Sequence, residues 1–391
     1  MTEYTSLEEI RLEKIETLRA EGIEVYPTRA RRTHTSVEAI AAFESAEASE
    51  TEVKAILAGR LRATRNMGKI SFAHIEDGAG RIQLFFRLND VGEEKLEFFA
   101  KMFDLGDFIE AEGVMFRTRT GEVTLRVQDF KLLAKAVTPL PAAKDETLED
   151  GTVVRHAALE DVQLRARQRY ADLAVNETTR ETFRKRATIV RSLREFLDNK
   201  DFLEVETPIL QPIYGGAAAQ PFTTHHNQLK QELFLRISFE LYLKRLLVGN
   251  LERVYEIGRD FRNEGVSYKH NPEFTQLEFY WAYADYLQVM ELTEQMVAFA
   301  AEKATGSMKV MYQGQEIDFS PPWNRLEMRQ GLLDACGVDI NECRDDASLH
   351  AALNERGIEH PAGAQRGKLI DWMVDEFLQD NMIQPTFLYN Y

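Results

Sequence analysis

The sequence predicts an α+β protein that has a five-stranded β-barrel in its N-terminal half and an antiparallel sheet flanked by helices in its C-terminal half. Hydrophobic residues alternate in short segments between residues 55 and 127, which is typical of strands. Longer apolar strands interspersed with helical patterns follow from residue 200 onward. The chain of 391 residues is long enough for two or three domains, each with its own core.

The first fifty residues begin with a predicted helix. The segment from Ser6 to Glu9 has the form of a capping box, in which a hydroxyl and a carboxylate three residues later satisfy free N–H groups at a helix start. Apolar residues then recur at helical steps, and Gly22 can end the helix before Pro27. We expect residues 1–50 to form an N-terminal helical extension.

Five strands and one inserted helix, at residues 93–103, are predicted next. The strands are expected at residues 55–62, 71–75, 81–86, 107–114 and 122–127. Asp77-Gly78 and Thr120-Gly121 supply turns between them. This order indicates a Greek-key barrel of the OB type, whose strand face binds single-stranded nucleic acid. We assign it to residues 51–141.

The charge of the chain is unevenly distributed. The chain has 48 Lys and Arg against 64 Asp and Glu, a net charge of −16, yet residues 51–136 carry 14 basic and 13 acidic side chains, a balance of +1. The remaining residues therefore hold −17. The predicted barrel therefore does not share the net negative charge of the rest of the chain, and electrostatic repulsion does not keep it from a polyanion.

Several classes of protein are excluded. The two cysteines, Cys336 and Cys343, cannot complete a four-ligand zinc site and indicate a reducing compartment. The N-terminus lacks the basic start and apolar stretch of a signal peptide, and no run of about 18 apolar residues suggests a membrane span. We expect a cytoplasmic protein that makes no membrane contact.

The polar stretch at residues 142–152 is a predicted linker, and residues 153–391 are assigned to a second domain. A long amphipathic helix is expected at residues 180–199, and helices dominate after Tyr286. Between them the pattern predicts strands at residues 233–237, 254–261 and 273–281, with a helix at residues 240–248.

The last two of these strands present a chemically distinctive face. In an extended segment alternate residues point the same way, so one face of the second strand carries Phe274, Gln276, Glu278 and Tyr280. The corresponding face of the preceding strand carries Glu256, Gly258, Asp260 and Arg262. A surface hairpin with cross-strand ion pairs is one interpretation. The aromatic and acidic mixture favours the other interpretation, a binding site.

Several motifs resemble those of a known family, the class II aminoacyl-tRNA synthetases of subclass IIb. Phe261-Arg-Asn-Glu-Gly with His270-Asn-Pro-Glu-Phe-Thr resembles motif 2, and Phe202-Leu-Glu-Val-Glu-Thr-Pro resembles motif 1. Gly215-Gly-Ala-Ala-Ala-Gln-Pro-Phe and Glu240-Leu-Tyr-Leu-Lys-Arg-Leu are similar to the lysine-specific branch. The segments that resemble the anticodon-binding OB domain of that branch are Met67-Gly-Lys-Ile-Ser-Phe, Gly80-Arg-Ile-Gln-Leu and Thr120-Gly-Glu.

The resemblance implies an activity, ATP-dependent activation of lysine and its transfer to tRNA(Lys), and a role for each matching residue. Arg262 is implied as the catalytic residue that bridges the amino-acid carboxylate and the α-phosphate. The implied ATP contacts are Arg262, Glu264, His270, Asn271 and Phe274. The implied lysine contacts are Gly216, Glu240, Arg262, Glu278 and Tyr280. A buried ammonium needs a counter-charge, whereas an aspartate-specific site needs a cation, and this favours lysine.

The resemblance also implies partners. Phe72, Gln83 and Glu122 match positions that contact the central anticodon uridine, by stacking or by polar contacts. By residue type alone, Phe72 is more typical of a core than of a stacking platform. Arg60, Arg62 and Lys69 are candidates for phosphate contacts. L-lysine, tRNA(Lys) and a second copy of the chain, bound through the motif 1 region as a homodimer, are the expected partners.

The sequence departs from the family pattern at three places. Gln220 stands where Arg is common, and Ser238-Phe239 where Ala-Pro is frequent. No counterpart of motif 3 occurs up to Tyr391, and the carboxylates that hold Mg²⁺ in the family belong to that segment, so no metal ligand is assigned. We therefore expect weak activity from these 391 residues alone.

Two further hypotheses compete with a lysine-activating synthetase. The first is a catalytically impaired synthetase fragment that serves as an RNA- or partner-binding module, which the missing motif 3 supports. The second is a ligase that modifies a protein lysine. The barrel at residues 51–136 counts against the second, because relatives of that kind resemble the catalytic domain alone.

Overall fold

The computed structural model describes residues 4–141, 144–147, 153–156, 159–267 and 270–390. Residues 142–143 and 148–152 of the predicted linker lie outside this range. The chain forms two compact units, Met1–Glu177 and Thr178–Tyr391. Each unit has its own core, and each is described by itself.

The predicted N-terminal helix is α1, Ser6–Ala20. The predicted capping box was wrong by one residue, because Thr5 and Glu8 form it: the Thr5 N–H donates to Glu8 at 2.9 Å, and the Glu8 N–H donates to the Thr5 hydroxyl at 3.4 Å. Two hydroxyl–glutamate pairs at the same spacing compete here, so the local motif alone could not decide between them. The sequence analysis missed a second helix, α2 (Ser36–Glu47), although Thr35 and Glu38 form a capping box at its start.

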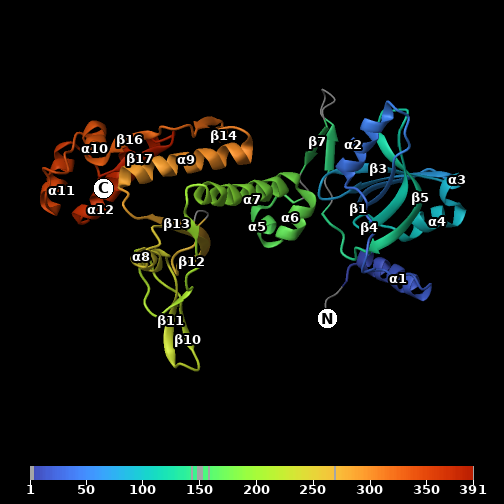
Figure 1. Cartoon of the computed structure of the whole chain (residues 1–391), viewed down its shortest axis with the longest axis horizontal. Coiled ribbons are helices and arrows are strands. Elements are labelled where there is room, and N and C mark those ends of the chain that lie inside the picture. Colours follow the sequence, from blue (N-terminus) through green and yellow to red (C-terminus); the bar gives the residue numbers. More distant parts are fainter. Residues whose placement is uncertain (1–3, 142–143, 148–152, 157–158, 268–269, 391) are drawn as a thin grey trace. The chain divides into compact units, whose positions relative to one another are not determined.

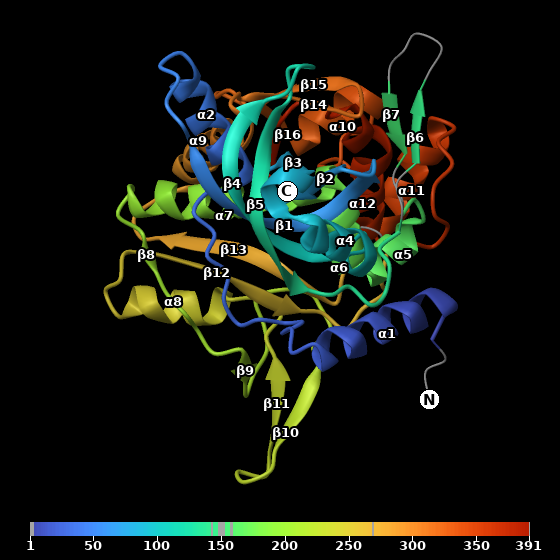
Figure 2. The ribbon, with the colours of Figure 1, turned by 90° about the vertical axis from the view of Figure 1, so that its right-hand side faces the viewer.

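The five-stranded barrel is confirmed. It closes in the order β1-β2-β3-β5-β4 (Figures 1 and 2). Its strands are β1 Lys54–Asn66, β2 Ile70–Glu76, β3 Arg81–Arg87, β4 Phe108–Arg117 and β5 Val123–Ala134. The helices α3 (Leu88–Val91) and α4 (Glu93–Met102) lie between β3 and β4 in the chain, at the predicted insertion.

The barrel core follows largely from the alternation of buried and outward-facing residues along β1, β2 and β3. Leu57, Ile75, Leu84 and Leu125 point inward and are almost fully buried. Their neighbours in sequence therefore point outward. The register pairs His74 with Gln83 and Phe72 with Phe85 on β2 and β3, so these residues meet on one outer face. Four short elements follow the barrel in the first unit: the paired strands β6 (Lys144–Thr147) and β7 (Val153–His156), and the helices α5 (Val162–Arg167) and α6 (Arg169–Val175).

The second unit begins with the predicted amphipathic helix, α7 (Glu177–Asp198). Its main sheet has the order β13-β12-β8, and a second sheet has the order β10-β11-β9 (Figure 2). The predicted central strands and the predicted helix between them are confirmed. The bounds are β8 Leu203–Glu204, β9 Leu210–Gln211, β10 Thr223–His226, β11 Gln231–Leu235, α8 Glu240–Val248, β12 Arg253–Phe261 and β13 Glu273–Trp281.

The remaining residues are mostly helical, as expected, with short strand pairs that the sequence analysis missed. One of these pairs, β16 with β17, is parallel and joins segments about sixty residues apart. Leu332, Leu349, Leu353 and Leu369 form a separate buried core around it. The elements are α9 Tyr286–Thr305, β14 Lys309–Tyr312, β15 Gln315–Asp318, β16 Asn324–Glu327, α10 Met328–Cys336, α11 Asp346–Glu355, α12 Arg366–Phe377, the 3₁₀ turn Gln379–Asn381 and β17 Thr386–Tyr389.

The barrel end near α1 contains a buried lysine whose removal gives a testable prediction. The Lys135 ammonium is fully buried and donates to Asp104, to Asp107 at 2.7 Å and to the Met102 carbonyl at 2.7 Å. Lys135→Met leaves the buried Asp107 carboxylate without its counter-ion, so we expect a loss of about 3–5 kcal/mol of opening free energy. Hydrogen exchange at the amides of β4 and β5 measures this loss directly.

Lys101→Met is the matched control, because Lys101 is exposed and pairs only with Glu97 on its own helix. That variant should change the opening free energy by about 0.5 kcal/mol or less. Equal effects of the two substitutions would show that burial of the Lys135 ion pairs does not matter.

Candidate functional site

The face predicted for the two long strands exists in the structure. The antiparallel register places Glu256 opposite Glu278, Gly258 opposite Gln276 and Asp260 opposite Phe274. Side chains on the other face, among them Leu277 and Phe279, pack into an apolar core under α7 and α9. Glu256 and Asp260 are only 4% and 0% exposed, so the interpretation as a surface hairpin was wrong.

Arg262 lies at the end of this face, beside the aromatic ring predicted to accompany it. Its guanidinium carbon is 5.1 Å from the centre of the Phe274 ring, a cation–π arrangement. Nη2 lies 3.5 Å from the Ile237 carbonyl, and the buried Nε has no hydrogen-bond partner. A planar cation held in this way, with its donors largely unused, can bind two oxyanions at once.

Glu278 lies in an acidic recess of the same face. One of its oxygens accepts hydrogen bonds from the Ser238 hydroxyl at 2.7 Å and from the Gln276 amide at 2.8 Å, while the buried Oε2 has no partner. Burial raises the pKa of the Glu278 carboxyl, and the neighbouring carboxylates of Glu240 and Glu256 act in the same direction. A cationic ligand would supply the missing partner and reverse this shift.

Tyr280 and Gly216 complete the recess with Glu240. Burial, together with the carboxylates of Glu278 and Glu240, raises the pKa of the Tyr280 hydroxyl, which stays neutral. Gly216 has φ +91°, and a Cβ built there would lie 2.7 Å from Glu240 Cβ. Only glycine fits at this position, and its backbone therefore lies directly against Glu240. The structure thus brings together four of the five residues predicted to contact lysine, whereas the fifth, Arg262, lies just beyond the end of β12.

The other predicted ATP contacts lie on the loop between β12 and β13. Glu264, His270 and Asn271 are exposed and are not part of the buried face. Glu264 accepts a hydrogen bond from the Gln220 N–H at 3.3 Å, and His270 Nδ1 lies 2.8 Å from the Ser267 hydroxyl. Residues 268 and 269 of this loop lie outside the described residues.

The sequence analysis missed Arg236, a buried arginine beneath the face. Its Nη1 donates to Glu256 at 2.6 Å and to the Thr207 carbonyl at 3.0 Å, and its Nε donates to the Arg259 carbonyl at 2.9 Å. The guanidinium stacks on Phe239 at 4.2 Å. A single arginine within the apolar run at residues 233–239 was the signal that could have revealed it.

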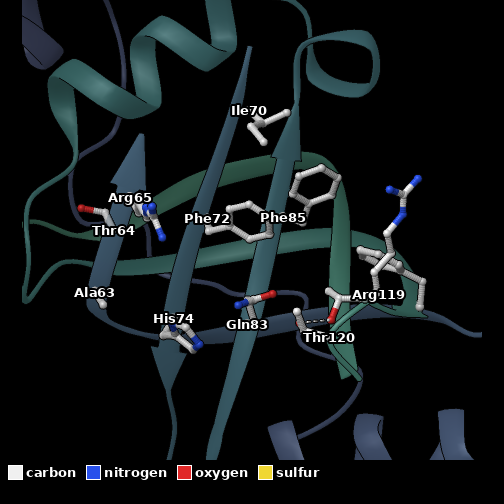
Figure 3. A pocket seen from close by; sticks show the side chains of 12 residues that line it. Ala63, Thr64, Arg65, Ile70, Phe72, His74, Gln83, Phe85, Arg119 and Thr120 are labelled. Carbon is white, nitrogen blue, oxygen red and sulfur yellow. Dashed lines mark hydrogen bonds between the residues drawn. The ribbon is translucent and has the colours of Figure 1, made fainter. Parts of the chain in front are cut away.

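A second candidate site covers the outer face of the barrel (Figure 3). Phe72 lies on this face and stacks near Phe85, with ring centres 4.9 Å apart, so the expectation that residue type places Phe72 in the core was wrong. The rings lie in a cavity of about 790 Å³. Its lining residues are Ala63, Thr64, Arg65, Ile70, Phe72, His74, Gln83, Phe85, Phe116, Thr118, Arg119 and Thr120.

A polar network borders these rings. Gln83 donates from its amide nitrogen to Glu122 at 2.8 Å and accepts from the Thr124 hydroxyl at 2.9 Å. His74 Nε2 lies 3.0 Å from the other Glu122 oxygen. The structure therefore brings the predicted residues Phe72, Gln83 and Glu122 together, and adds His74.

The cations near the cavity are not those named from the sequence. Arg62 pairs with Glu76 at 2.7 Å, and Arg60 stacks over Phe108 at 4.4 Å, so neither lines the cavity. Arg65 and Arg119 line it instead. Arg65 lies beyond a bulge in β1 that shifts its register, and Arg119 lies between β4 and β5.

Within the described residues, no group of three or more His, Cys, Asp or Glu side chains is placed to hold a metal ion. Cys336 and Cys343 are free thiols. None of the described helices has both the length and the apolar character needed to span a bilayer.

Comparison with known proteins gives a consistent result. Residues 161–391 match the family of class II tRNA synthetases (D, K and N), and residues 55–133 match the OB-fold nucleic acid binding domain. A lysine–tRNA ligase of Clostridium novyi (strain NT) is 46% identical over 393 aligned positions, which cover 100% of this chain and 74% of the relative. Similar enzymes of Clostridium tetani and Syntrophomonas wolfei are 47% and 45% identical, and 75% of each is covered.

Proposed function

The chain belongs to the lysine–tRNA ligases of class II, and we propose that its β12–β13 face binds ATP and lysine while its barrel face binds the anticodon of tRNA(Lys). The observation that carries the proposal is the arrangement of the β12–β13 face. Glu278, on this face, is a buried carboxylate with one oxygen that has no hydrogen bond within the described residues, and the Arg262 guanidinium, whose buried Nε also has none there, lies over the Phe274 ring of the same face. One end can bind anions and the other a cation, as lysine and ATP require.

In the proposed reaction the lysine carboxylate attacks the α-phosphate of ATP, and pyrophosphate leaves. Both reactants are anionic, so the main barrier that the protein can lower is charge repulsion. Arg262 would contact both anions and stabilise the charge that develops at the α-phosphate. No side chain needs to act as a nucleophile. The product is lysyl-adenylate; its lysyl group then passes to the terminal ribose hydroxyl of the tRNA, and AMP leaves.

We assign the remaining ATP contacts to Phe274 and the neighbouring loop. The Phe274 ring, on the same face as Arg262, would stack on adenine, and Glu264, His270 and Asn271 would contact the adenine edge and the phosphates. The hydrogen bond from the Gln220 N–H to Glu264 ties this loop to the 215–222 segment, which also carries Gly216. Mg²⁺ would neutralise phosphate charge in the reaction, but the described residues provide no ligands for it, and no step is assigned to it.

The choice of lysine would depend on the acidic recess. Glu278 offers a buried oxygen without a partner, and Tyr280 adds a neutral hydroxyl that can accept a hydrogen bond. The ε-ammonium of lysine fits both. Glu240 and the Gly216 backbone would hold the α-ammonium group.

We also propose a homodimer formed through the motif 1 region. Leu203, Ile209, Leu210 and Ile213 are large apolar side chains left exposed within eleven residues of the chain. Such a concentration is typical of a protein interface. The alternative, a catalytically impaired synthetase fragment that serves as an RNA- or partner-binding module, predicts no lysine-dependent ATP–pyrophosphate exchange from these 391 residues.

Arg262→Ala should greatly reduce lysine-dependent ATP–pyrophosphate exchange in the full-length protein. The expected loss of kcat/KM is about 10²- to 10³-fold, as for removal of one important oxyanion donor. Arg259→Ala is the matched control, because Arg259 lies on the opposite face of the same strand and is exposed. Near-normal exchange in Arg262→Ala would remove Arg262 from its proposed role.

Glu278→Gln should raise the KM for lysine while leaving the KM for ATP nearly unchanged. Loss of the buried counter-charge should cost about 2–5 kcal/mol, which corresponds to about 30-fold or more in KM. Discrimination against norleucine should fall as well, because the recess no longer rejects an uncharged side chain. Glu273→Gln, at the exposed end of β13, is the control. Equal loss of affinity for ATP would indicate misfolding instead.

Phe72→Ala should weaken binding of an anticodon stem-loop with central uridines by about 1–3 kcal/mol. The melting midpoint should change little, because Phe72 lies on the outer face. Phe86→Ala is the contrasting control: Phe86 is fully buried, and its removal should cost about 3–5 kcal/mol of unfolding free energy. If Phe72→Ala instead loses stability and its folded fraction binds RNA normally, Phe72 is not a stacking platform.

A further inference from the structure

Two complementary buried groups on β12 and just beyond it lack hydrogen-bond partners. Both carboxylate oxygens of Asp260 are buried without a hydrogen bond, and so is Nε of Arg262. Asp260 is fully buried and lies opposite Phe274, and Arg262 follows two residues later, just beyond β12, with its guanidinium carbon 5.1 Å from the centre of the same Phe274 ring. An acceptor and a donor that are both desolvated and both unpaired are complementary to each other.

Arg236 does not satisfy Asp260. Its Nε lies 3.3 Å from Asp260 Oδ1, but that Nε–H donates to the Arg259 carbonyl at 2.9 Å. Its Nη1 is engaged by Glu256 and Thr207. The guanidinium cannot turn freely, because Phe239 lies against its face and the Gly258 backbone lies close to Nη2. Arg236 therefore supplies positive charge near Asp260 and leaves the carboxylate free to accept another donor.

We propose that Asp260 is a positioning residue, which accepts a hydrogen bond from Nε of Arg262 when substrates bind and thereby aims the two terminal nitrogens of Arg262 at the substrate anions. The proposal rests on the proposed role of Arg262. A guanidinium is planar, and its five N–H donors have a fixed geometry. Anchoring Nε fixes the plane and leaves the Nη1 and Nη2 donors for the lysine carboxylate and the α-phosphate.

The charge of Asp260 is sensitive to pH in the range where the enzyme would work. The groups that face it are Arg236 after β11, Glu256 and Arg262 of the β12 segment, and Glu278 of β13. Burial raises the pKa of the Asp260 carboxyl to about 7; Arg236 and Arg262 oppose the rise, and Glu278 and Glu256 add to it. The ionised form, which accepts most strongly, is therefore populated above about pH 7.

The test measures ATP–pyrophosphate exchange in the full-length protein between pH 6 and 8.5 for Asp260→Asn and Asp260→Val. The wild type should gain kcat as the pH rises through 7. Asn keeps an acceptor without charge, so its kcat should fall about 10-fold and lose this pH dependence. Val offers no acceptor, and its kcat should fall about 100-fold. The KM for lysine should change little in Asp260→Asn, because the acidic recess is intact.

The decisive comparison introduces Asp260→Asn into the Arg262→Lys variant. Lysine has neither a guanidinium plane nor the Nε–H that Asp260 is proposed to anchor. Adding Asp260→Asn to Arg262→Lys should lower kcat less than twofold further. A tenfold additional loss would overturn the proposal, as would wild-type kcat and pH dependence in Asp260→Asn. If Arg262→Ala itself retains normal exchange, the proposed role of Arg262 fails first. If Arg262→Ala is inactive and the Asp260 variants are normal, only the present inference fails.

A stability measurement gives a readout independent of activity. The pKa of Asp260 is about 7 in the folded chain and is near 4 when the chain unfolds, so the folded form holds a proton that the unfolded form lacks between these values. Stability from this group is therefore present at low pH and is lost as the pH rises toward 7. Asp260→Asn should raise the denaturation midpoint relative to the wild type more at pH 8 than at pH 4.5. A constant difference would show that Asp260 is ionised throughout and would contradict the burial on which the inference depends.

Discussion

The geometry of the β12–β13 face depends on one buried ion pair, between Arg236 and Glu256. Their atoms are 2.6 Å apart, and both side chains are almost fully buried. Glu256 also accepts from the Thr207 N–H and hydroxyl, so the pair joins the chain after β8, the end of β11 and the centre of β12. A buried pair of this kind adds little net stability compared with apolar packing, but it tolerates few alternative arrangements. Ser238 and Glu240 lie two and four residues after Arg236 in the chain. The Arg236–Glu256 pair therefore also sets where the acidic recess lies relative to Glu278.

That constraint leaves several polar groups of the face without partners. Within the described residues, Asp260, Arg262 Nε and Glu278 Oε2 are all buried without a hydrogen bond, and each such group costs on the order of 1–3 kcal/mol. The two carboxylates and the guanidinium are the groups that charged substrates would satisfy or align. The face is thus organised around interactions that the free chain does not make. The apolar opposite side of the same strands, with Leu277 and Phe279 in the core, supplies the rigidity that holds these groups in place.

The sequence predicted what depends on local periodicity and little of what depends on distant contacts. Strand alternation gave the β12–β13 face correctly, because successive side chains of an extended strand point to opposite faces. The same alternation could have placed Phe72 outside the barrel, since Ala73 and Ile75 point inward on β2, but residue type was given more weight. The capping box of α1 failed because two hydroxyl–glutamate pairs share one spacing. The β16–β17 pairing and the contacts of Arg236 join segments remote in sequence, and no local pattern encodes them.

On the outer face of the barrel, the orientation of one polar side chain, Gln83, is set before any ligand binds. The Thr124 hydroxyl donates to the Gln83 carbonyl oxygen, so the Gln83 amide nitrogen must face Glu122. Because both ends of the Gln83 amide are hydrogen-bonded, this amide presents a defined donor beside Phe72. An amide that rotated freely could present either its N–H donor or its carbonyl acceptor there. A base stacked on the ring would therefore meet an ordered edge, while the charge balance of +1 over residues 51–136 avoids repelling its phosphates. Stacking supplies affinity, and the ordered amide allows one base to be distinguished from another.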